Sequence, residues 1–512
     1  MILLHNGTLI DGTGNPQRKA SVLIDGEKIK DVGTIAPTPD MEITDCSGQV
    51  VAPGFIDVHS HADLEILEHR PEKVMQGVTS EVVGNCGFSL FPRMPSSELV
   101  PVFNIFAARE QREWPDAAAY FSDVEETTTR TNIAALTGHS TLRAGVSGLK
   151  SGSLDAADRR EVEKRLSVCL EQGSIGLSTG LNEVPSSYGD FAELARLCRI
   201  VRQHNAFYTS HLRDYKFHIL EAVQEALDLG RRTQVPVQIS HLQTVGRKNW
   251  DKMDAVLNLI DRAHAEGVDV GIDAYPYLAG SCNLTQLLPI WSMDGGTEQL
   301  LHRLADQDTR QRIAAETEGY MANGWEDILL GTLINPDQQD LVGQTIQAVA
   351  DARGYPGVET ALDLLIENQG GVMIISFNQS EENLRKVLSH PLTSIITDGV
   401  FIEGKPHPRT FGTYPTFLGE YIREKKWMSL EDAIHKVTAL PARRFRLADR
   451  GLLKPGQGAD ITVFSATAIG TKSNYDEPSQ SPEGIEHVLI NGAWALRQGQ
   501  LQSSFAGRPL RN

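Results

Sequence analysis

Cysteine is scarce in this chain. Its 512 residues include five cysteines, Cys46, Cys86, Cys169, Cys198 and Cys282. These are too few and too scattered for a disulfide framework, which excludes the small disulfide-stabilised class and fits a reducing compartment. Most are expected to be small buried hydrophobic residues. Cys86 differs, because it follows the apolar run of EVVGNCG, and it is kept as a candidate metal ligand.

Long apolar runs and an excess of positive charge are also missing. No stretch reaches the roughly 18 apolar residues of a membrane-spanning helix, and the N-terminal MILLHNGTLIDGTG has no basic segment followed by an apolar core. Lys and Arg total 48 against 66 Asp and Glu, a net charge of −18. Such a surface disfavours nucleic acid and anionic membranes. We therefore expect a cytoplasmic protein with neither partner, and the sequence leaves its oligomeric state open.

The composition that remains is that of a globular protein, with 40% hydrophobic and 22% charged residues. The two ends of the chain share one sequence pattern. Residues 2–50 alternate short apolar runs with turn residues, as small antiparallel strands do, and the same pattern returns between about 450 and 500. We predict that residues 1–52 and 450–512 together form a small β-sandwich-like domain.

The chain between these ends alternates apolar runs with helical patterns. The runs end in polar or glycine residues: SEVVGNCG, NIAALTGH, SIGLSTGL, AFYTSHL, VPVQISHL, VDVGIDAYPY and TSIITDG. In one spacer Leu220, Val223 and Leu227 form a helical stripe, and Gly230 is predicted to end the helix. With a first strand over Val50–His61, about eight such units predict an α/β fold, a (β/α)8 TIM-type barrel over residues 53–449.

One segment interrupts this rhythm. Residues 281–370 form a long, mainly helical stretch, which we interpret as an insertion covering the mouth of the active site. The strand GVMIISF, residues 371–377, is then either extra or a sign that the strand count is off by one.

Two histidines in PGFIDVHSHAD raise the question of chemistry. In a strand, His59 and His61 would point to the same face, as a metal site requires, although a bare His-x-His is more often a surface pair. Other donors also follow predicted strands, and the full set is His59, His61, Cys86, His139, His211, His241 and Asp398. Each alone could merely cap a loop. Together at the carboxyl ends of barrel strands they favour a metal centre.

The types of donor indicate which metal and which kind of site. Imidazole and thiolate select Zn²⁺ over the hard cations, which prefer oxygen. A structural zinc site has four closely spaced ligands, whereas these are dispersed and include a spare carboxylate. The pattern therefore favours catalytic zinc.

Several motifs carry a resemblance that covers nearly the whole chain. They are PGFIDVHSHAD, EVVGNCG, TGHSTLR, GLSTGL, SHLRD, ISHL, DAYPY, TDG, PHPRTFGTYP, SLEDAIHKVTALPARRFRLADRG and GADITVF. The chain resembles the amidohydrolase superfamily, and within it the D-aminoacylase (N-acyl-D-amino-acid deacylase) family. The resemblance implies that Cys86, His211 and His241 hold a tightly bound zinc. It also implies that His59, His61 and Asp398 frame a second, weaker or vacant position, with Asp398 as the general base.

The resemblance also implies how substrate is bound. Arg409 in PHPRTFG would grip the substrate α-carboxylate bidentately, and Tyr275 and Ser281 would line the pocket. A surface salt bridge for Arg409, and simple packing for Tyr275, are the alternatives.

The chain departs from the family pattern at three positions. Gln243 replaces a lysine, Glu183 a tyrosine, and Tyr215 an acidic residue. The first two changes make the pocket less positive. We therefore expect poor activity on N-acetyl-D-amino acids with small apolar side chains, and better activity on substrates with a basic group or a masked carboxylate.

These observations lead to one expected function and two alternatives. We expect zinc-dependent hydrolysis of the amide bond of N-acyl-D-amino acids or closely related small amides. A cyclic-amide hydrolase of the hydantoinase or dihydroorotase type would usually carry a lysine on the fourth strand, which GLSTGL lacks. A non-catalytic scaffold would be expected to lose ligands, and here all six are present.

Overall fold

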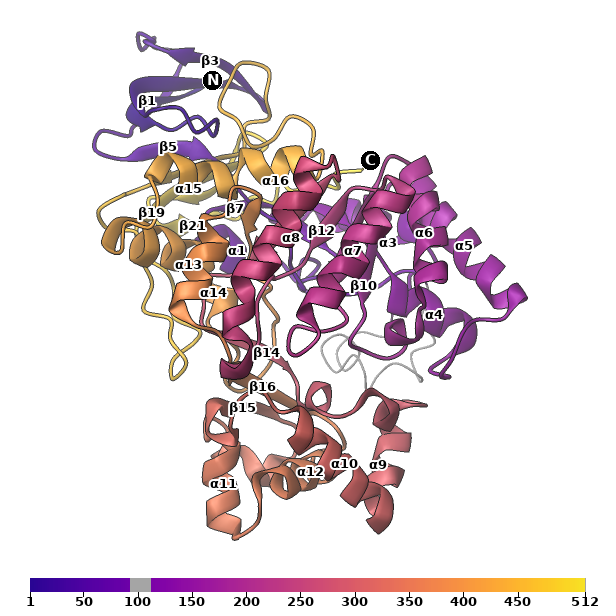
Figure 1. The fold of residues 1–512 in the computed structure, drawn as a ribbon. Coiled ribbons are helices and arrows are strands. Elements are labelled where there is room, and N and C mark those ends of the chain that lie inside the picture. Colours follow the sequence, from indigo (N-terminus) through magenta and orange to yellow (C-terminus); the bar gives the residue numbers. More distant parts are fainter. Residues whose placement is uncertain (93–111, 512) are drawn as a thin grey trace.

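The computed structural model describes residues 1–92 and 112–511. Three regions follow one another in Figure 1. A sheet that contains both ends of the chain lies at the top, an α/β body lies in the middle, and a smaller lobe lies at the bottom. No helix in the described part of the chain combines the length and the apolar character that crossing a membrane would require.

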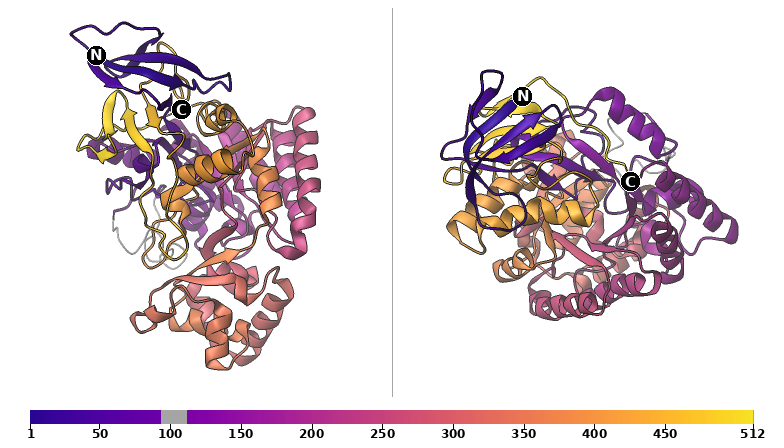
Figure 2. Two further views of the ribbon diagram at one scale, coloured as in Figure 1. Left: turned by 90° about the vertical axis from the view of Figure 1, so that its left-hand side faces the viewer. Right: turned by 90° about the horizontal axis from the view of Figure 1, so that it is seen from above.

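Strands from both ends of the chain form one sheet. Its order is β21-β20-β19-β18-β5-β1-β2-β3, and β4 pairs with β1. The strands are β1 Ile2–Leu9, β2 Arg18–Asp25, β3 Lys28–Gly33, β4 Glu42–Asp45, β5 Val50–Pro53, β18 Ile461–Phe464, β19 Ile485–Ile490, β20 Ala493–Arg497 and β21 Gln500–Leu501. The two halves meet where β18 pairs antiparallel with β5. Figure 2 shows the N-terminal and C-terminal strands side by side in both views.

The body contains two parallel sheets, β6-β7-β8 and β9-β10-β11-β12-β13-β17. The strands are β6 Phe55–Asp57, β7 Val78–Val83, β8 Asn132–Ala135, β9 Thr137–Gly138, β10 Gly176–Gly180, β11 Phe207–His211, β12 Val237–Ile239, β13 Val270–Ala274 and β17 Thr393–Ile395. Only Leu136 separates β8 from β9 in the chain. At the opposite edges of the two sheets, the residues that follow β6 and β17 also meet. The Asp398 amide donates to the His59 carbonyl at 2.9 Å, and Ser60 pairs with Gly399.

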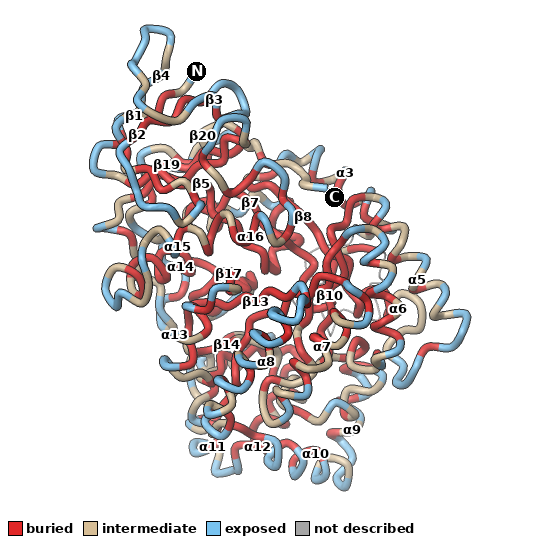
Figure 3. Tube along the Cα trace, turned by 45° about the horizontal axis from the view of Figure 1, so that its top comes forward, coloured by how far each residue is buried: buried red, intermediate tan, exposed pale blue. Residues whose placement is uncertain are grey.

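Helices surround these parallel strands, which are buried at the centre of the molecule (Figure 3). They are α1 Glu72–Met75, α3 Ala117–Thr127, α4 His139–Ser147, α5 Ala156–Glu171, α6 Phe191–Gln203, α7 Ile219–Thr233, α8 Met253–Ala265, α13 Glu381–Ser389, α14 Arg409–Thr416, α15 Leu430–Val437 and α16 Ala439–Arg444. Short 3₁₀ segments Ser186–Tyr188 and Arg247–Lys252 and a π-helical segment Phe417–Glu424 connect some of them.

The prediction that Gly230 ends a helix is wrong. Helix α7 continues to Thr233, and Gln234 follows it in the left-handed conformation at φ 59°. A Cβ added at Gly230 would lie 2.9 Å from Val268 Cγ1 and 3.0 Å from Val237 Cγ2. The glycine therefore serves the close packing of α7 on β12 rather than termination of the helix.

The lobe at the bottom of Figure 1 is built around an antiparallel sheet of order β14-β16-β15. Its strands and helices are β14 Ala279–Asn283, β15 Ile328–Leu333, β16 Val372–Phe377, α9 Thr297–Ala305, α10 Gln307–Tyr320, α11 Ile346–Arg353 and α12 Gly357–Glu367. Short 3₁₀ segments lie at Leu284–Leu287, Ile290–Met293, Trp325–Asp327 and Pro336–Leu341. The strand predicted from GVMIISF is β16, so it belongs to this sheet and not to the parallel strands.

The single strand predicted over Val50–His61 is also wrong. The chain leaves β5 in the terminal sheet and enters β6 in the body at Gly54, where an added Cβ would lie 2.1 Å from Thr79 Oγ1. Two sheets that meet at this point require a residue without a side chain. His59 and His61 therefore lie just beyond β6 and not within a strand.

Candidate metal centre and active site

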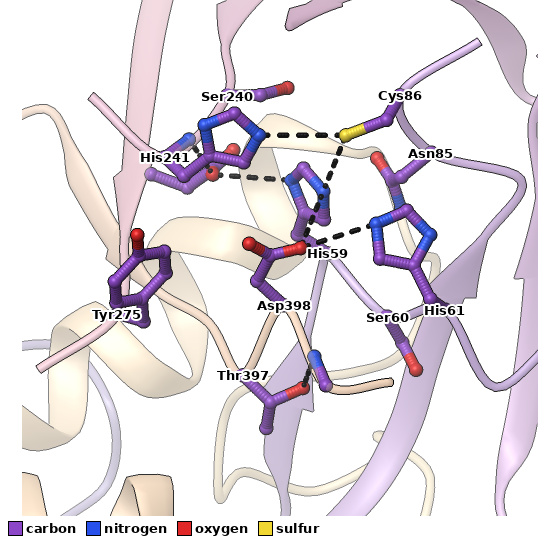
Figure 4. A network of polar contacts seen from close by, with 12 residues as sticks. His59, Ser60, His61, Asn85, Cys86, Ser240, His241, Tyr275, Thr397 and Asp398 are labelled. Carbon is purple, nitrogen blue, oxygen red and sulfur yellow. Dashed lines mark hydrogen bonds and ion pairs between the residues drawn. The ribbon is translucent and has the colours of Figure 1, made fainter. Parts of the chain in front are cut away.

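The carboxyl ends of the parallel strands bring six nitrogen, sulfur and oxygen donors together. Figure 4 labels all of them except His211. In chain order the donors follow or end strands β6, β7, β11, β12 and β17, and they are His59, His61, Cys86, His211, His241 and Asp398. Parallel strands present their carboxyl ends at one edge, so residues far apart in the sequence become neighbours there.

Three groups of donors lie close enough to share an ion. Within each, one ligand atom per residue lies within 4.8 Å of the others: His59, His61 and Cys86; Cys86, His211 and His241; His59, His241 and Asp398. Cys86 Sγ lies 3.3 Å from His59 Nε2 and 3.5 Å from His241 Nε2. The thiol is thus shared by the first two groups, and His59 and His241 connect these to the third.

Three of these residues have an uncommon backbone conformation. Cys86, His241 and Asp398 lie at φ of 52°, 33° and 48°. A side chain other than that of glycine rarely occupies this region, and such strain is maintained only when the surrounding structure imposes it. It occurs here at three neighbouring donors, which makes the strand ends candidates for function.

Burial lowers the pKa of His59, but Asp273 and Asp398 outweigh burial and raise that pKa overall, whereas burial prevails at the other three histidine donors. It lowers the pKa of His241 to about 4 and holds that of His211 well below its usual value, and it also lowers the pKa of His61. His211 Nε2 and His241 Nδ1 are buried without a hydrogen-bond partner. Neutral imidazoles with unpartnered nitrogens are the form that binds a metal ion.

Asp398 lies between these histidines and a buried cation. Its Oδ1 is 3.2 Å from His61 Nε2 and 3.4 Å from His59 Nε2, and its Oδ2 is 2.8 Å from an Arg409 guanidinium nitrogen. Burial raises the pKa of Asp398, but Arg409 and His59 outweigh burial and hold it well below the usual value. Asp398 is therefore an ionised carboxylate, able to accept a proton.

A large cavity opens at this edge of the strands. Its volume is about 1050 Å³, and it extends from His211, His241 and Asp398 to the lobe. Glu183, Gln243, Tyr275, Ser281 and Arg409, the residues that sequence reasoning assigned to substrate, all line it. The structure thus brings the candidate substrate residues and the metal donors to one space.

Contacts within the cavity link these substrate residues. Arg409 lies over the Tyr275 ring at 4.8 Å and donates to the Ser281 carbonyl at 3.4 Å. Tyr275 donates its hydroxyl proton to Gln243 Oε1 at 3.2 Å. The guanidinium is held against the ring with one side toward Asp398.

Two supporting residues escaped sequence reasoning. Asp273, at the end of β13, accepts the His241 amide proton at 2.7 Å and lies 3.4 Å from His59 Nδ1. Tyr215, noted only as a departure from the family pattern, packs its ring on His211 and His241 at centroid distances of 5.0 and 5.3 Å. Asp273 could have been identified from the sequence, because it is a carboxylate at the end of the strand that runs into DAYPY. No local signal placed Tyr215 between two imidazoles.

A buried charged network behind the donors was also missed. Lys73 bonds to Asp57, donates to Thr397 Oγ1 at 2.7 Å, and lies 3.3 Å from Glu81. Asp57 in turn accepts the Thr397 amide proton at 3.0 Å. The network joins the end of β6 to the residue that precedes Asp398.

We expected His139 to lie with the metal donors, but the structure places it elsewhere. Its Nδ1 lies 2.7 Å from Ser186 Oγ and its Nε2 2.9 Å from Glu193, which also pairs with Arg143. Both ring nitrogens are therefore engaged elsewhere, and His139 anchors the segment after β10.

Comparison with known proteins identifies the family. The model of a family described as "Amidohydrolase family" matches residues 42–494. The chain belongs to this amidohydrolase family. An N-acyl-D-glutamate deacylase of Alcaligenes xylosoxydans xylosoxydans is 35% identical over 513 residues, covering 100% of this chain and 96% of that protein.

Solved structures of amidohydrolases share this fold. The N-acyl-D-glutamate deacylase of Bordetella Bronchiseptica, complexed with zinc and a phosphonate inhibitor that mimics the tetrahedral intermediate, has a TM-score of 0.86 and 31% identity, covering 100% of this chain and 99% of that one. A D-aminoacylase structure, also at TM-score 0.86, 31% identity and the same coverage, concerns a binuclear metal centre with one-metal activation and second-metal attenuation.

Proposed function

We propose that this amidohydrolase uses zinc to hydrolyse the amide bond of N-acyl-D-amino acids or closely related small amides, releasing the free amine and a carboxylate. The observation that carries the proposal is the buried Asp398. Its carboxylate lies between histidine donors on one side and Arg409 on the other, at the edge of a cavity large enough for such a substrate.

The donor set suits zinc. We assign one tightly held ion to Cys86, His211 and His241. The unpartnered buried Nε2 of His211, and the position of His241 Nε2 3.5 Å from Cys86 Sγ, support this assignment. We assign a second, weaker position to His59, His61 and Asp398, because both histidines lie within 3.4 Å of the Asp398 carboxylate. Burial and nearby carboxylates raise the pKa of the Cys86 thiol, so a bound cation is needed to hold it as the thiolate ligand.

The mechanism combines the metal with the residues around it. Zinc supplies Lewis acidity, which polarises an amide carbonyl and lowers the pKa of a water. Asp398 is ionised in the free enzyme and accepts the proton of the attacking water. It then gives that proton to the leaving nitrogen, so the amide is cut without a covalent intermediate. Asp273 orients His59 and the backbone of His241.

Arg409 is the residue proposed to hold the substrate α-carboxylate. A guanidinium binds a carboxylate through two parallel hydrogen bonds. Tyr275 and Ser281 keep this guanidinium facing the cavity, and Gln243 fixes the Tyr275 hydroxyl. A substrate carboxylate bound there would take over part of the pairing that Arg409 makes with Asp398, which leaves Asp398 freer to accept a proton.

We also propose that the parallel strands close into a (β/α)8 barrel, with β8 and β9 counted as one strand. The one-residue step between β8 and β9, and the backbone contacts between the β6 and β17 ends, support closure. Residues 1–52 and 450–512 would form the small β domain of the predicted division, and residues 281–370 would cover the mouth of the barrel. The cavity lining shared by both regions supports the latter.

The proposal is tested with zinc-loaded protein and a panel of amides. The panel contains N-acetyl-D-amino acids, their L-enantiomers, dipeptides and hydantoins, and free amine or ring opening is measured. Release of amine from linear D-substrates is expected. Activity confined to hydantoins would favour the cyclic-amide alternative, which the absence of lysine from β10 argues against.

The role of Asp398 is tested by Asp398→Asn. The amide keeps the shape but cannot accept a proton, so kcat should fall by about 10²–10⁴-fold while tightly bound zinc remains. Arg409→Lys is the matched control, because it keeps the cation but loses bidentate geometry, and it should mainly raise KM. Near wild-type turnover in Asp398→Asn would overturn the assignment of the base.

A further inference from the structure

Most charged groups that line the cavity already have a partner. Arg213 pairs with Glu225 at 3.0 Å and Arg409 with Asp398 at 2.8 Å. Glu316 pairs with Arg312 at 2.8 Å. A charge that is already paired attracts a ligand only weakly. The cavity groups without an ion pair are therefore the candidates for binding a charged ligand.

Glu183 is such a group. Within residues 1–92 and 112–511 no cation lies within ion-pair distance of its carboxylate, whose hydrogen-bond partner is the neutral amide of Gln286. Burial raises the pKa of Glu183 to about 8, and the hydrogen bond from Gln286 only partly opposes this. The protein thus places a carboxyl group in the cavity without supplying the cation that would hold it ionised.

Asp214, which also lines the cavity without an ion pair among the described residues, accepts from the Tyr320 hydroxyl. Lys216, likewise without an ion pair there, is better satisfied than Glu183. Its ammonium lies 5.2 Å from the centre of the Tyr320 ring, and the charge of Asp214 acts on it. Besides burial, Glu183 and Lys216 both act on the pKa of the Cys282 thiol, which Glu183 raises and Lys216 lowers. A cationic group of a ligand near Glu183 would therefore supply the positive charge that its carboxylate lacks.

Glu183 also lies on a fixed segment whose backbone is hydrogen-bonded to that of a proposed zinc ligand. Two residues before it, Leu181 donates its amide proton to the carbonyl of His211, a proposed zinc ligand, at 3.0 Å. Three residues after it, Ser186 is held by the buried His139. Gln286, the hydrogen-bond partner of Glu183, lies five residues after Ser281, whose carbonyl accepts from Arg409. A substrate held by Arg409 would thus lie in the cavity that Glu183 also lines.

We propose that Glu183 is a specificity-determining residue that selects substrates carrying a cationic group, an ammonium or a guanidinium, near the scissile amide. This rests on the proposed deacylase function. The cation can belong to the D-amino acid side chain or to the acyl half, where an aminoacyl group carries its ammonium. Both sources offer Glu183 the same charge-assisted hydrogen bond.

Two matched pairs of substrates separate the two sources. N-acetyl-D-lysine and N-acetyl-D-norleucine differ by a side-chain ammonium, whereas glycyl-D-leucine and N-acetyl-D-leucine differ by an ammonium on the acyl half. In the zinc-loaded wild-type protein the cationic member of at least one pair should have a kcat/KM about 10-fold or more above its neutral partner.

Three variants test the assignment to Glu183. Glu183→Gln keeps the shape and should bring the kcat/KM ratio of the favoured pair close to one. Glu183→Lys should invert it and improve N-acetyl-D-glutamate relative to N-acetyl-D-norleucine. Glu221→Gln removes an exposed carboxylate at the rim of the same cavity and should keep the wild-type ratio.

A binding measurement separates this inference from the function itself. Calorimetric titration of zinc-loaded Asp398→Asn protein, in which hydrolysis is slowed, with the same four compounds reports recognition, and the preference for the cationic member should again depend on Glu183. Preferential binding together with no amine release by the zinc-loaded wild-type protein would overturn the deacylase function and leave the assignment of Glu183 standing. Neutral members preferred in both pairs, or a ratio unchanged in Glu183→Gln, would overturn the inference.

Discussion

At the scale of single residues, the site depends on one sulfur atom. Cys86 Sγ is in contact with His59 and His241, and it belongs to two of the three donor groups. Its positive φ of 52° aims the thiol at this point. A serine or alanine there would leave two imidazoles with no anionic ligand to complete the tight set.

We predict that Cys86→Ala loses zinc. Wild-type protein should retain about one zinc per chain after dialysis against a chelator, because a thiolate and two imidazoles form a strong three-ligand set. Elemental analysis gives the stoichiometry. Cys198→Ala is the control, since that thiol is equally buried but lies in helix α6 away from the donors. Stoichiometric zinc in dialysed Cys86→Ala would contradict the assignment.

At the scale of elements, buried charges join the strand ends. Lys73, on the short helix α1, is 3% exposed and pairs with Asp57 and Glu81, which are 0% and 2% exposed. Both carboxylates need this cation, because an uncompensated buried charge is costly. The ends of β6 and β17, which carry His59, His61 and Asp398, therefore share one support.

Lys73→Met should lower the free energy of unfolding by about 3–5 kcal/mol, because it leaves two buried carboxylates without their cation. Urea unfolding followed by circular dichroism measures this. Lys28→Met breaks the exposed pair with Asp449 and should cost less than about 1 kcal/mol. Equal costs for the two variants would show that the buried network contributes no more than a surface pair.

Lys436 on helix α15 makes stability depend on pH. Burial lowers its pKa to about 8, and its ammonium donates to the carbonyls of His390 and Thr393. In the unfolded chain the value is 10.5. Between about pH 8 and 10.5 the unfolded state therefore binds more protons than the folded state, so this group makes the free energy of unfolding rise with pH over that window.

Wild type should thus gain up to about 3 kcal/mol relative to Lys436→Met between pH 8 and 10.5. Urea unfolding of both proteins at several pH values measures the difference. Lys386→Met is the control, because Asp254 and Glu382 raise the pKa of that exposed lysine and it should give no such gain. A difference that stays constant with pH would contradict the role of Lys436.

At the scale of the whole molecule, both ends of the chain complete one sheet. β18 pairs with β5, and the buried Asp460 joins Arg450, at 2.6 Å, to Asn132 at the start of β8, at 2.8 Å. The C-terminal segment therefore supports the parallel strands as well as the terminal sheet.

A chain that ends at residue 458 should fail to unfold cooperatively, since it lacks β18–β21 and leaves β5 with an open edge. Differential scanning calorimetry would show the missing transition. Removing only Arg511 and Asn512 is the control, because Arg511 makes an exposed pair with Glu125 and its loss should shift Tm little. A cooperative transition in the shorter chain would show that the body folds alone.

The sequence by itself determined the family, the use of zinc and the donors that gather at the strand ends. The family followed from the resemblance of its motifs, and zinc from the imidazole and thiolate donors. The gathering of these donors could be predicted because alternating strands and helices are recognised from local periodicity, and parallel strands place their carboxyl ends at one edge. Only the tertiary structure decided that His139 turns to Glu193, that Gly54 divides the first strand and that Lys73 joins β6 to β17. It also decided that Glu183 has no cation partner among the residues that the structure describes. These outcomes depend on contacts between residues far apart in the chain, and no local pattern of residues contains them.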